Sequence, residues 1–170
     1  MFFVNVKAPS PWQRCVIELP CGELKLYFSE TAIGRLVLPG DPVSPQGEPS
    51  FVTGKLPWGE LENELKEFFK GREIRDSYPL LADGYSSFTL KVLQLTAAIP
   101  FGETRTYGEI AVASGSLRGA RAVGQALGRN NTPLLIPCHR VIGQRGALGG
   151  FSSGLGWKRQ LLALEGHRIS

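Results

Sequence analysis

The sequence predicts an α+β protein, with a small sheet covered by a helix in its first half and a mostly helical second half. Three observations support this fold class. Short apolar segments separated by turn residues fill the first forty positions, and apolar residues at helical spacing dominate after residue 86. The chain of 170 residues, 42% hydrophobic and 20% charged, can bury one core or two small ones, which excludes disordered and collagen-like classes.

Three strands are predicted in the N-terminal half. The segments "VIEL" at 16–19 and "ELKLYF" at 23–28 flank the turn signal Pro20-Cys21-Gly22, and "AIGRLVL" at 32–38 follows after a polar break. Residues 39–57 are rich in Pro, Gly and Ser and show no periodicity. We therefore expect a loop there.

A helix is predicted over "PWGELENELKEFFKG" at 57–71, with Pro57 near its start and Gly71 as its stop. One face of this helix carries the apolar residues Leu61, Leu65, Phe68 and Phe69. The pattern then fades over residues 72–86. We expect an N-terminal α/β domain over 1–78, a linker over 79–86 and a C-terminal domain over 87–170.

The C-terminal half is predicted to be helical. The segment 87–100, "SFTLKVLQLTAAIP", begins with Ser87 as a capping residue and ends at Pro100. Its expected apolar face consists of Phe88, Val92, Leu95 and Ile99. "TYGE" at 106–109 forms a capping box that opens a short helix, and a second helix follows over "RGARAVGQALG" at 118–128. Two short helices joined by a tight turn have the shape of a helix-turn-helix.

The second of these helices carries small side chains along most of its length. Ala120, Ala122, Gly124 and Ala126 leave Arg121 as its main projecting group. Close packing against another helix explains this pattern. Close approach to a DNA groove explains it equally well.

Positive charge is concentrated in the C-terminal part. Residues 1–100 carry 10 Lys and Arg against 12 Asp and Glu, whereas residues 101–170 carry 9 against 3. Six arginines lie within about forty residues opposed by Glu109 alone: Arg105, Arg118, Arg121, Arg129, Arg140 and Arg145. This pattern fits either a solvated basic face or a phosphate-binding surface.

The three cysteines are expected to be thiols. The N-terminus lacks a signal peptide and no apolar run is long enough for a membrane span, so we expect an intracellular protein in a reducing compartment. The spacing of Cys15 and Cys21 fits no common zinc motif and no histidine lies near them. These two residues are predicted to be structural, with an adventitious disulfide as the alternative.

Cys138 and His139 are neighbours in "IPCHRV" at 136–141, which raises the question of a reactive thiol. A cysteine becomes a nucleophile as a thiolate and therefore needs a base or positive charge nearby. On an extended chain, adjacent side chains point to opposite faces, so contact requires a backbone turn or a bridging water. Five glycines within residues 143–154 favour a pocket walled by loops. A buried, inert cysteine beside a satisfied histidine is the alternative.

Two hydrolase interpretations are disfavoured. "GFSSG" at 150–154 fits G-x-S-x-G, but no strand-turn-helix pattern surrounds it and the one histidine downstream is His167. A papain-like protease would place its cysteine at a helix start, with a histidine distant in sequence.

Five segments resemble, in order and spacing, the motifs of the O6-alkylguanine-DNA alkyltransferases: "FTLKVL" at 88–93, "FGETRTYGEIA" at 101–111, "RAVGQAL" at 121–127, "PCHRVIG" at 137–143 and "GGFSSGLGWKRQLLALEG" at 149–166. PCHRV with an upstream RAVG is the most specific pair. Over residues 1–85 the resemblance is architectural. It implies an RNase H-like N-terminal domain and a winged-helix-like DNA-binding domain with a helix-turn-helix.

The resemblance implies DNA repair by direct, irreversible transfer of an alkyl group from O6 of guanine to Cys138, one per molecule. His139 would remove the thiol proton through a water, and Glu165 would hold the imidazole. Asn130 matches the asparagine that fixes the turn before the cysteine, and Tyr107 matches the donor to the departing guanine. Four residues would line the base and alkyl pocket: Pro133, Val141, Phe151 and Ser152.

The resemblance also implies that double-stranded DNA is bound through its minor groove and that the damaged base is flipped out. Arg121 would fill the vacancy, while Ala120, Ala122 and Gly124 let the helix approach closely and Tyr107 contacts the DNA. O4-alkylthymine is a second candidate substrate. We expect a monomer without cofactor, metal or membrane partner, in the cytoplasm of a prokaryote and associated with the nucleoid.

Some positions depart from the family pattern. Leu117 and Asn131 stand where proline is common, and Arg129 is shifted by one position, which should alter loop details and DNA affinity. The N-terminal half has no histidine, so we predict no structural zinc. Two alternatives are a protein that flags lesions without transfer, whose relatives lack the acceptor cysteine, and a methylation-sensing regulator, whose expected sign is a fused domain.

Overall fold

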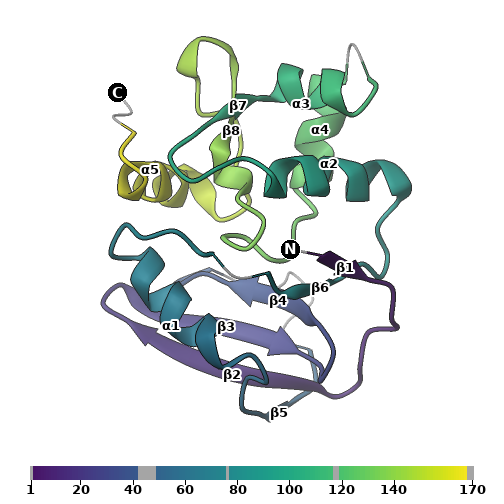
Figure 1. Cartoon of the computed structure of the whole chain (residues 1–170), viewed down its shortest axis with the longest axis vertical. Coiled ribbons are helices and arrows are strands. Elements are labelled where there is room, and N and C mark those ends of the chain that lie inside the picture. Colours follow the sequence, from purple (N-terminus) through teal and green to yellow (C-terminus); the bar gives the residue numbers. More distant parts are fainter. Residues whose placement is uncertain (1, 42–48, 76, 117–118, 168–170) are drawn as a thin grey trace. The chain divides into compact units, whose positions relative to one another are not determined.

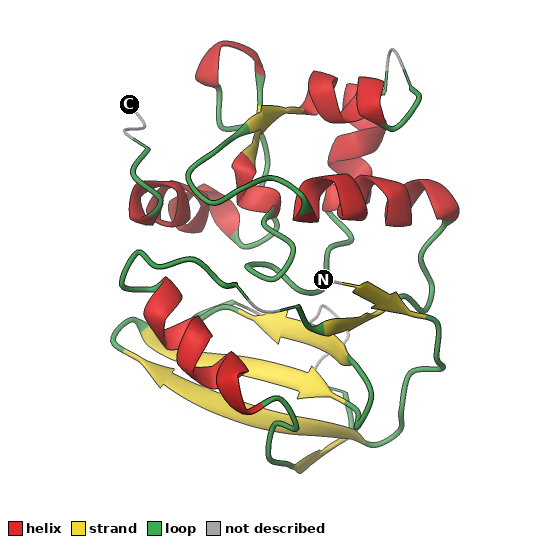
Figure 2. Ribbon diagram, in the orientation of Figure 1, coloured by secondary structure: helices red, strands yellow, loops and turns green. Residues whose placement is uncertain are grey.

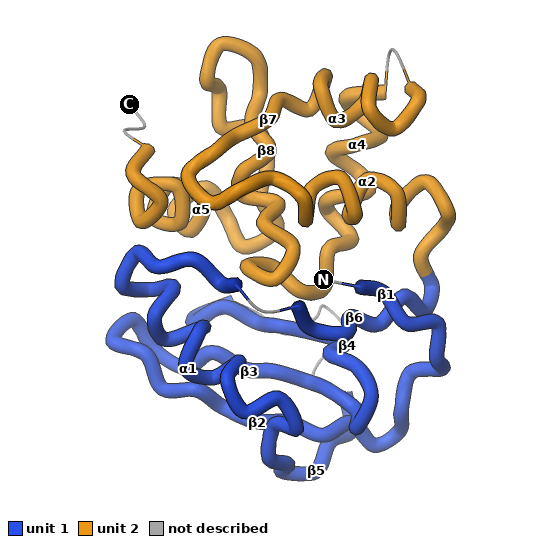
Figure 3. The backbone as a smooth tube through the Cα atoms, in the orientation of Figure 1, with its two compact units in different colours: residues 1–84 blue, residues 85–170 orange. Residues whose placement is uncertain are grey.

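The computed structural model describes residues 2–41, 49–75, 77–116 and 119–167, which belong to two compact units. The first unit spans residues 1–84 and the second residues 85–170 (Figure 3). Each unit buries apolar side chains of its own. The predicted combination of a sheet with a covering helix, followed by a mostly helical half, is confirmed.

Unit 1 is built on a six-stranded sheet with the strand order β1-β6-β4-β3-β2-β5 (Figure 1). The strands are β1 (Phe2–Val4), β2 (Trp12–Leu19), β3 (Gly22–Phe28), β4 (Ile33–Val37), β5 (Phe51–Thr53) and β6 (Pro79–Leu81). Strands β2 to β4 are antiparallel neighbours, and β2 and β3 pair from Gln13↔Phe28 to Leu19↔Gly22. The predicted turn at Pro20-Cys21 therefore closes this hairpin.

Helix α1 (Gly59–Phe68) lies across one face of this sheet (Figure 2). It buries Leu61, Leu65 and Phe68, three of the four residues predicted for its apolar face. Trp58, just before the helix, packs edge-on against Phe28 of β3 with ring centroids 6.3 Å apart. This predicted helix is confirmed.

In unit 1, the short strands β1, β5 and β6 lie where no strand is predicted from sequence. β5 lies within the predicted loop 39–57 and pairs in parallel with β2, and β6 lies within the predicted linker and pairs with β1 and β4. Three-residue strands carry no readable alternation, and their partners are distant in sequence. Residues 42–48 of that loop lie outside the described residues.

Unit 2 combines helices with a two-stranded parallel sheet. Its helices are α2 (Ser87–Ala97), α3 (Tyr107–Ala113), α4 (Ala120–Leu127) and α5 (Gly154–Leu164), and its strands are β7 (Arg105–Thr106) and β8 (Val141–Ile142). Residues 117 and 118, between α3 and α4, lie outside the described part, so the Leu117 departure has no structural account. None of the helices described is long and apolar enough to cross a membrane.

The helix starts of unit 2 follow capping rules. Thr106 caps α3, and Glu109 returns a hydrogen bond to the Thr106 amide at 2.6 Å, so the predicted capping box is confirmed. Helix α2 is capped by Ser86, which accepts from the Thr89 amide at 3.2 Å, instead of the predicted Ser87. The buried face of α2 shifts accordingly and consists of Thr89, Val92, Leu93 and Thr96.

The two adjacent serines provide a matched test of this cap. We expect Ser86→Ala to lower the free energy of unfolding by about 1 kcal/mol, because the Thr89 amide loses its acceptor. Ser87→Ala, an exposed change inside the first turn, should alter it by less than about 0.5 kcal/mol. Urea unfolding followed by circular dichroism at 222 nm measures both. The opposite ranking would return the cap to Ser87.

Candidate active site

Cys138 lies on a tight turn at the centre of unit 2. It opens a 3-10 turn over Cys138–Arg140, and its amide donates to the carbonyl of Ile136 at 2.7 Å. The thiol residue is 5% exposed and His139 is fully buried. The backbone therefore turns at the cysteine, as contact or a water bridge between thiol and imidazole requires.

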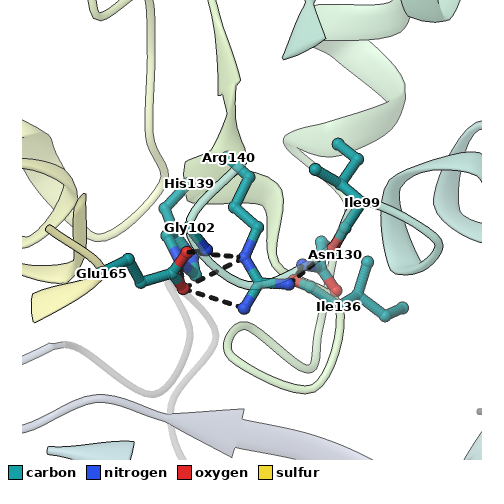
Figure 4. Close-up of polar contacts among 7 residues, drawn as sticks. All are labelled: Ile99, Gly102, Asn130, Ile136, His139, Arg140 and Glu165. Carbon is teal, nitrogen blue, oxygen red and sulfur yellow. Dashed lines mark hydrogen bonds and ion pairs between the residues drawn. The ribbon is translucent and has the colours of Figure 1, made fainter. Parts of the chain in front are cut away.

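Asn130 holds this turn from one side. Its Nδ2 donates to the Ile136 carbonyl at 2.9 Å (Figure 4). The same Nδ2 donates to Sγ of Cys138 at 3.1 Å, and Oδ1 accepts from the Thr132 amide at 3.1 Å. One buried amide group thus joins the start of the loop, its end and the sulfur. The predicted location of Asn130 beside the cysteine agrees with this geometry.

Glu165 holds the turn from the other side (Figure 4). Its carboxylate is 2.8 Å from Nε2 of His139 and accepts from Nε and Nη2 of Arg140 at 2.9 to 3.0 Å. It also accepts from the Gly102 amide at 3.0 Å, while Nη1 of Arg140 donates to the Ile99 carbonyl at 2.7 Å. Two cationic or basic side chains and one amide therefore surround one buried carboxylate.

These contacts fix the protonation states of the network. Although burial opposes ionisation, the hydrogen bonds from His139 and Arg140 and their charges lower the pKa of Glu165 to about 2. Burial lowers the pKa of His139, and the Glu165 hydrogen bond and charge oppose that change. At neutral pH this pattern pairs an ionised carboxylate with an uncharged imidazole, which is the form that can accept a proton.

The sulfur itself is protonated at rest. Burial raises the pKa of the Cys138 thiol, whereas the hydrogen bond from Asn130 and the nearby charge of Lys158 lower it. A buried thiol of this kind needs a base at the moment of reaction. The neutral His139 next to it is the candidate.

Lys158 is a fully buried cation whose role the sequence did not suggest. Its Nζ donates to the carbonyl oxygens of Val141 at 2.6 Å and Gly150 at 3.1 Å, and it lies 3.5 Å from the hydroxyl of Tyr107. Burial lowers the pKa of Lys158 to about 8. A signal was present, because Lys158 and Glu165 share helical spacing with the buried Leu161 and Leu162 of α5.

Tyr107 is the first residue of α3, and its hydroxyl lies near Lys158. Its hydroxyl donates to the Gly150 carbonyl at 3.1 Å, and burial raises its pKa, with the Cys138 charge acting in the same direction. The ring leaves no room for a side chain at Gly149, where an added Cβ would lie 2.6 Å from a ring carbon. Tyr107 thus keeps its proton near the thiol.

A cavity of about 670 Å³ opens in front of the sulfur. Seven of the residues predicted for the site line it: Tyr107, Ala120, Arg121, Gly124, Cys138, Phe151 and Ser152. Asn130, His139 and Glu165 are buried, where they support the thiol. Ala122, Pro133 and Val141 are not among the lining residues, and the Val141 carbonyl faces Lys158.

Cys15 and Cys21 are free and differ from Cys138 in setting. Burial and the charge of Glu62 raise the pKa of Cys15 to about 11, and Cys21 is exposed. Within the described residues, no group of three His, Cys, Asp or Glu side chains is arranged to hold a metal ion. The cavity and the polar network both converge on Cys138.

These features define a protein with a buried thiol that is supported by a base and faces a cavity lined in part by helices α3 and α4. The family model for the DNA-binding domain of 6-O-methylguanine DNA methyltransferase matches residues 87–167. The human methylated-DNA–protein-cysteine methyltransferase is 34% identical over 169 residues, covering 92% of this chain and 82% of the human protein. The constitutive enzyme of Bacillus subtilis is 40% identical over 140 residues, covering 79% and 83%.

A solved structure is similar over nearly the whole chain. The crystal structure of Mycobacterium tuberculosis OGT in complex with DNA aligns with a TM-score of 0.79 at 34% identity, covering 91% of this chain and 93% of that one. The chain therefore belongs to the methylated-DNA–protein-cysteine methyltransferase family.

The depressed pKa of Glu165 predicts how stability depends on pH. The contribution of the Glu165 carboxylate to the free energy of unfolding is fully present above pH 4.5. This contribution, on the order of 3 kcal/mol, is lost as the pH falls from 4.5 toward 2. Glu165→Gln should lower the free energy of unfolding by about 3 to 5 kcal/mol at pH 7, because it leaves Arg140 buried without a carboxylate. The stability of this variant should not show the loss between pH 4.5 and 2. Urea unfolding across this pH range measures both effects.

Glu103 provides the matched control for this experiment. It forms an exposed ion pair with Arg105 at 3.0 Å, so Glu103→Gln should cost less than about 1 kcal/mol and leave the acid dependence intact. An equally steep acid dependence in Glu165→Gln would show that another group titrates.

Proposed function

We propose that this protein repairs DNA by transferring an alkyl group from O6 of guanine to Sγ of Cys138, as a single-turnover methylated-DNA–protein-cysteine S-methyltransferase. The observation that carries this proposal is the buried thiol of Cys138, held by Asn130 on one side, supported by His139 and Glu165 on the other, and open to a cavity. Family membership supports the same reaction.

His139 acts as the base that activates the thiol. Because Nε2 is bound to Glu165, Nδ1 takes the proton of Cys138 through a bridging water. The imidazolium that forms is stabilised by the Glu165 carboxylate, which Arg140 keeps ionised. The Asn130 amide and Lys158 stabilise the thiolate left behind.

The thiolate then attacks the alkyl carbon of the damaged base. A sulfur–carbon bond forms as the carbon–O6 bond breaks, and the electron pair of that bond remains on the guanine. Tyr107 donates a proton or hydrogen bond to the departing guanine, which makes it a better leaving group. Phe151 and Ser152 contact the base and alkyl group from the cavity wall, and Pro133 and Val141 shape this pocket from behind.

The product thioether is neutral and has no proton for His139 to remove. No group in the proposed mechanism provides for cleaving the new sulfur–carbon bond. Each molecule therefore acts once, and the reaction is stoichiometric.

Helix α4 binds the DNA and stabilises the flipped-out base, which then reaches the thiol. Its small residues Ala120, Ala122 and Gly124 let the helix approach the minor groove closely, and Arg121 is exposed at the rim of the cavity. Arg121 enters the base stack and takes the place of the flipped guanine, whose extrusion costs a few kcal/mol. The exposed arginines of unit 2 contact phosphates without reading sequence. Arg140, one of the six predicted for this surface, is buried and bonded to Glu165, so it is not one of them.

The remaining assignments follow from this function. Unit 1 is an RNase H-like domain, supported by its three antiparallel strands extended by parallel β6, and unit 2 is winged-helix-like, supported by the β7–β8 pair beside the helix-turn-helix. The chain passes from the N-terminal to the C-terminal domain over residues 79–86, and the first three of these residues form strand β6 instead of a free linker. The protein acts as a monomer on chromosomal DNA in a prokaryotic cytoplasm, with O4-alkylthymine as a second substrate.

Intact mass tests the transfer directly. After incubation with a short duplex containing O6-methylguanine, we expect a gain of one methyl group per molecule, mapped to the peptide that contains Cys138. Cys138→Ala should bind the duplex without any gain, and Cys21→Ser, which removes an exposed thiol, should react like the unaltered protein. Tight binding without methylation of Cys138 would instead indicate a protein that only flags lesions.

Replacement of Arg121 separates base flipping from chemistry. We expect Arg121→Ala to slow repair of duplex DNA by roughly ten- to hundredfold. Without the arginine side chain, nothing fills the space in the base stack, so the free-energy cost of flipping the base is not offset. The reaction with free O6-benzylguanine should be unchanged. Arg159→Ala, an exposed arginine of α5 outside the cavity, is the control for lost charge. Equal slowing on both substrates would contradict the flipping role.

A further inference from the structure

Tyr85, the first residue of unit 2, bonds to the loop that carries Asn130. Its hydroxyl donates to the Arg129 carbonyl at 3.0 Å and accepts from the Asn131 amide at 3.3 Å. One phenol oxygen therefore connects to the chain on both sides of Asn130. No motif in the sequence suggested this contact, because Tyr85 and Asn131 are 46 positions apart.

The two bonded groups belong to the two peptide units that flank Asn130. The Arg129 carbonyl is part of the peptide before it, and the Asn131 amide is part of the peptide after it. Because these planes define φ and ψ of Asn130, a bridge between them restricts both angles. The bridge thereby sets the direction in which the Asn130 side chain leaves the backbone.

The direction of the Asn130 side chain matters because both its amide nitrogen and its amide oxygen form hydrogen bonds. Nδ2 contacts Sγ of Cys138 at 3.1 Å and the Ile136 carbonyl at 2.9 Å, and Oδ1 holds the Thr132 amide. A rotation of Asn130 would stretch all three contacts together. The contact to sulfur favours the thiolate.

The residue at position 131 makes this bridge available. Asn131 has a backbone N–H that donates to the Tyr85 hydroxyl, and a proline at this position would have none.

We propose that Tyr85 is a positioning residue for the reaction of Cys138: its hydroxyl clamps the backbone around Asn130 so that the Asn130 amide stays directed at the sulfur. This inference rests on the proposed function for its effect on repair. Its effect on the thiol itself does not depend on DNA.

Other groups that face the sulfur remain in place when the clamp is removed. Lys158 from α5, His139 beside the cysteine and Tyr107 from α3 are the ionisable groups near Cys138. Tyr85 is not among the lining residues of the cavity, so its hydroxyl can be removed without altering the wall that receives the base. A change in thiol reactivity on removing the hydroxyl can then be assigned to Asn130.

The test compares Tyr85→Phe with Tyr78→Phe in the full chain. Tyr78 lies in unit 1 and its hydroxyl donates to Glu64 at 2.8 Å, so its replacement removes a phenol hydrogen bond within the unit that does not contain Cys138. Both variants carry Cys21→Ser. Three quantities are measured: the rate of methyl transfer from duplex DNA, the pH dependence of Cys138 alkylation by iodoacetamide, followed by peptide mapping, and the melting temperature.

We expect Tyr85→Phe to slow methyl transfer by about three- to tenfold, the equivalent of one lost hydrogen bond. The pH profile of Cys138 alkylation should shift to higher pH. Tyr78→Phe should change the melting temperature by a similar amount and leave both the rate and the profile unaltered. An unshifted profile in Tyr85→Phe, or equal slowing in both variants, would overturn the clamp. Absence of methyl transfer in the unaltered protein would overturn the proposed function, while the alkylation profile would still decide on the clamp.

Discussion

The site depends on one buried carboxylate. Glu165 lies at the end of α5 and accepts hydrogen bonds from Gly102, His139 and Arg140, which belong to two distant parts of unit 2. A buried charge of this kind is stable only while its partners are present. The same contacts that hold α5 against the cysteine turn also fix which nitrogen of His139 carries the proton, while burial keeps its imidazole uncharged. Structural stability and chemical readiness have a common origin here.

Cys138 is buried from solvent and lies close to the positive charge of Lys158. Burial keeps the thiol protonated and His139 uncharged, while Lys158 and the Asn130 amide stand ready to stabilise a negative sulfur. In the proposed mechanism, the thiolate forms in the presence of a base and a bound substrate instead of persisting at rest. Such an arrangement protects a residue that reacts once from oxidants and stray electrophiles.

Local features of this structure are predictable from sequence, and long-range ones are not. The capping box at Thr106 and the buried face of α1 depend on residues three or four positions apart, so their spacing reveals them. Strands β5 and β6 depend on partners across the sheet. Lys158 and Arg140 bond to backbone carbonyls of Val141 and Ile99, and a carbonyl leaves no mark in the sequence. The PCHRV motif indicated the chemistry, and the fold supplied its supports.

Gly149 illustrates how an aromatic ring constrains sequence change at a distance. Its φ of +68° already disfavours other residues, and the ring of Tyr107 occupies the space that any Cβ would need. A substitution at Gly149, which lies in a loop, would therefore displace the side chain of Tyr107 on helix α3. We expect substitutions of Gly149 to disturb the site through Tyr107, although Gly149 takes no part in any bond-making step.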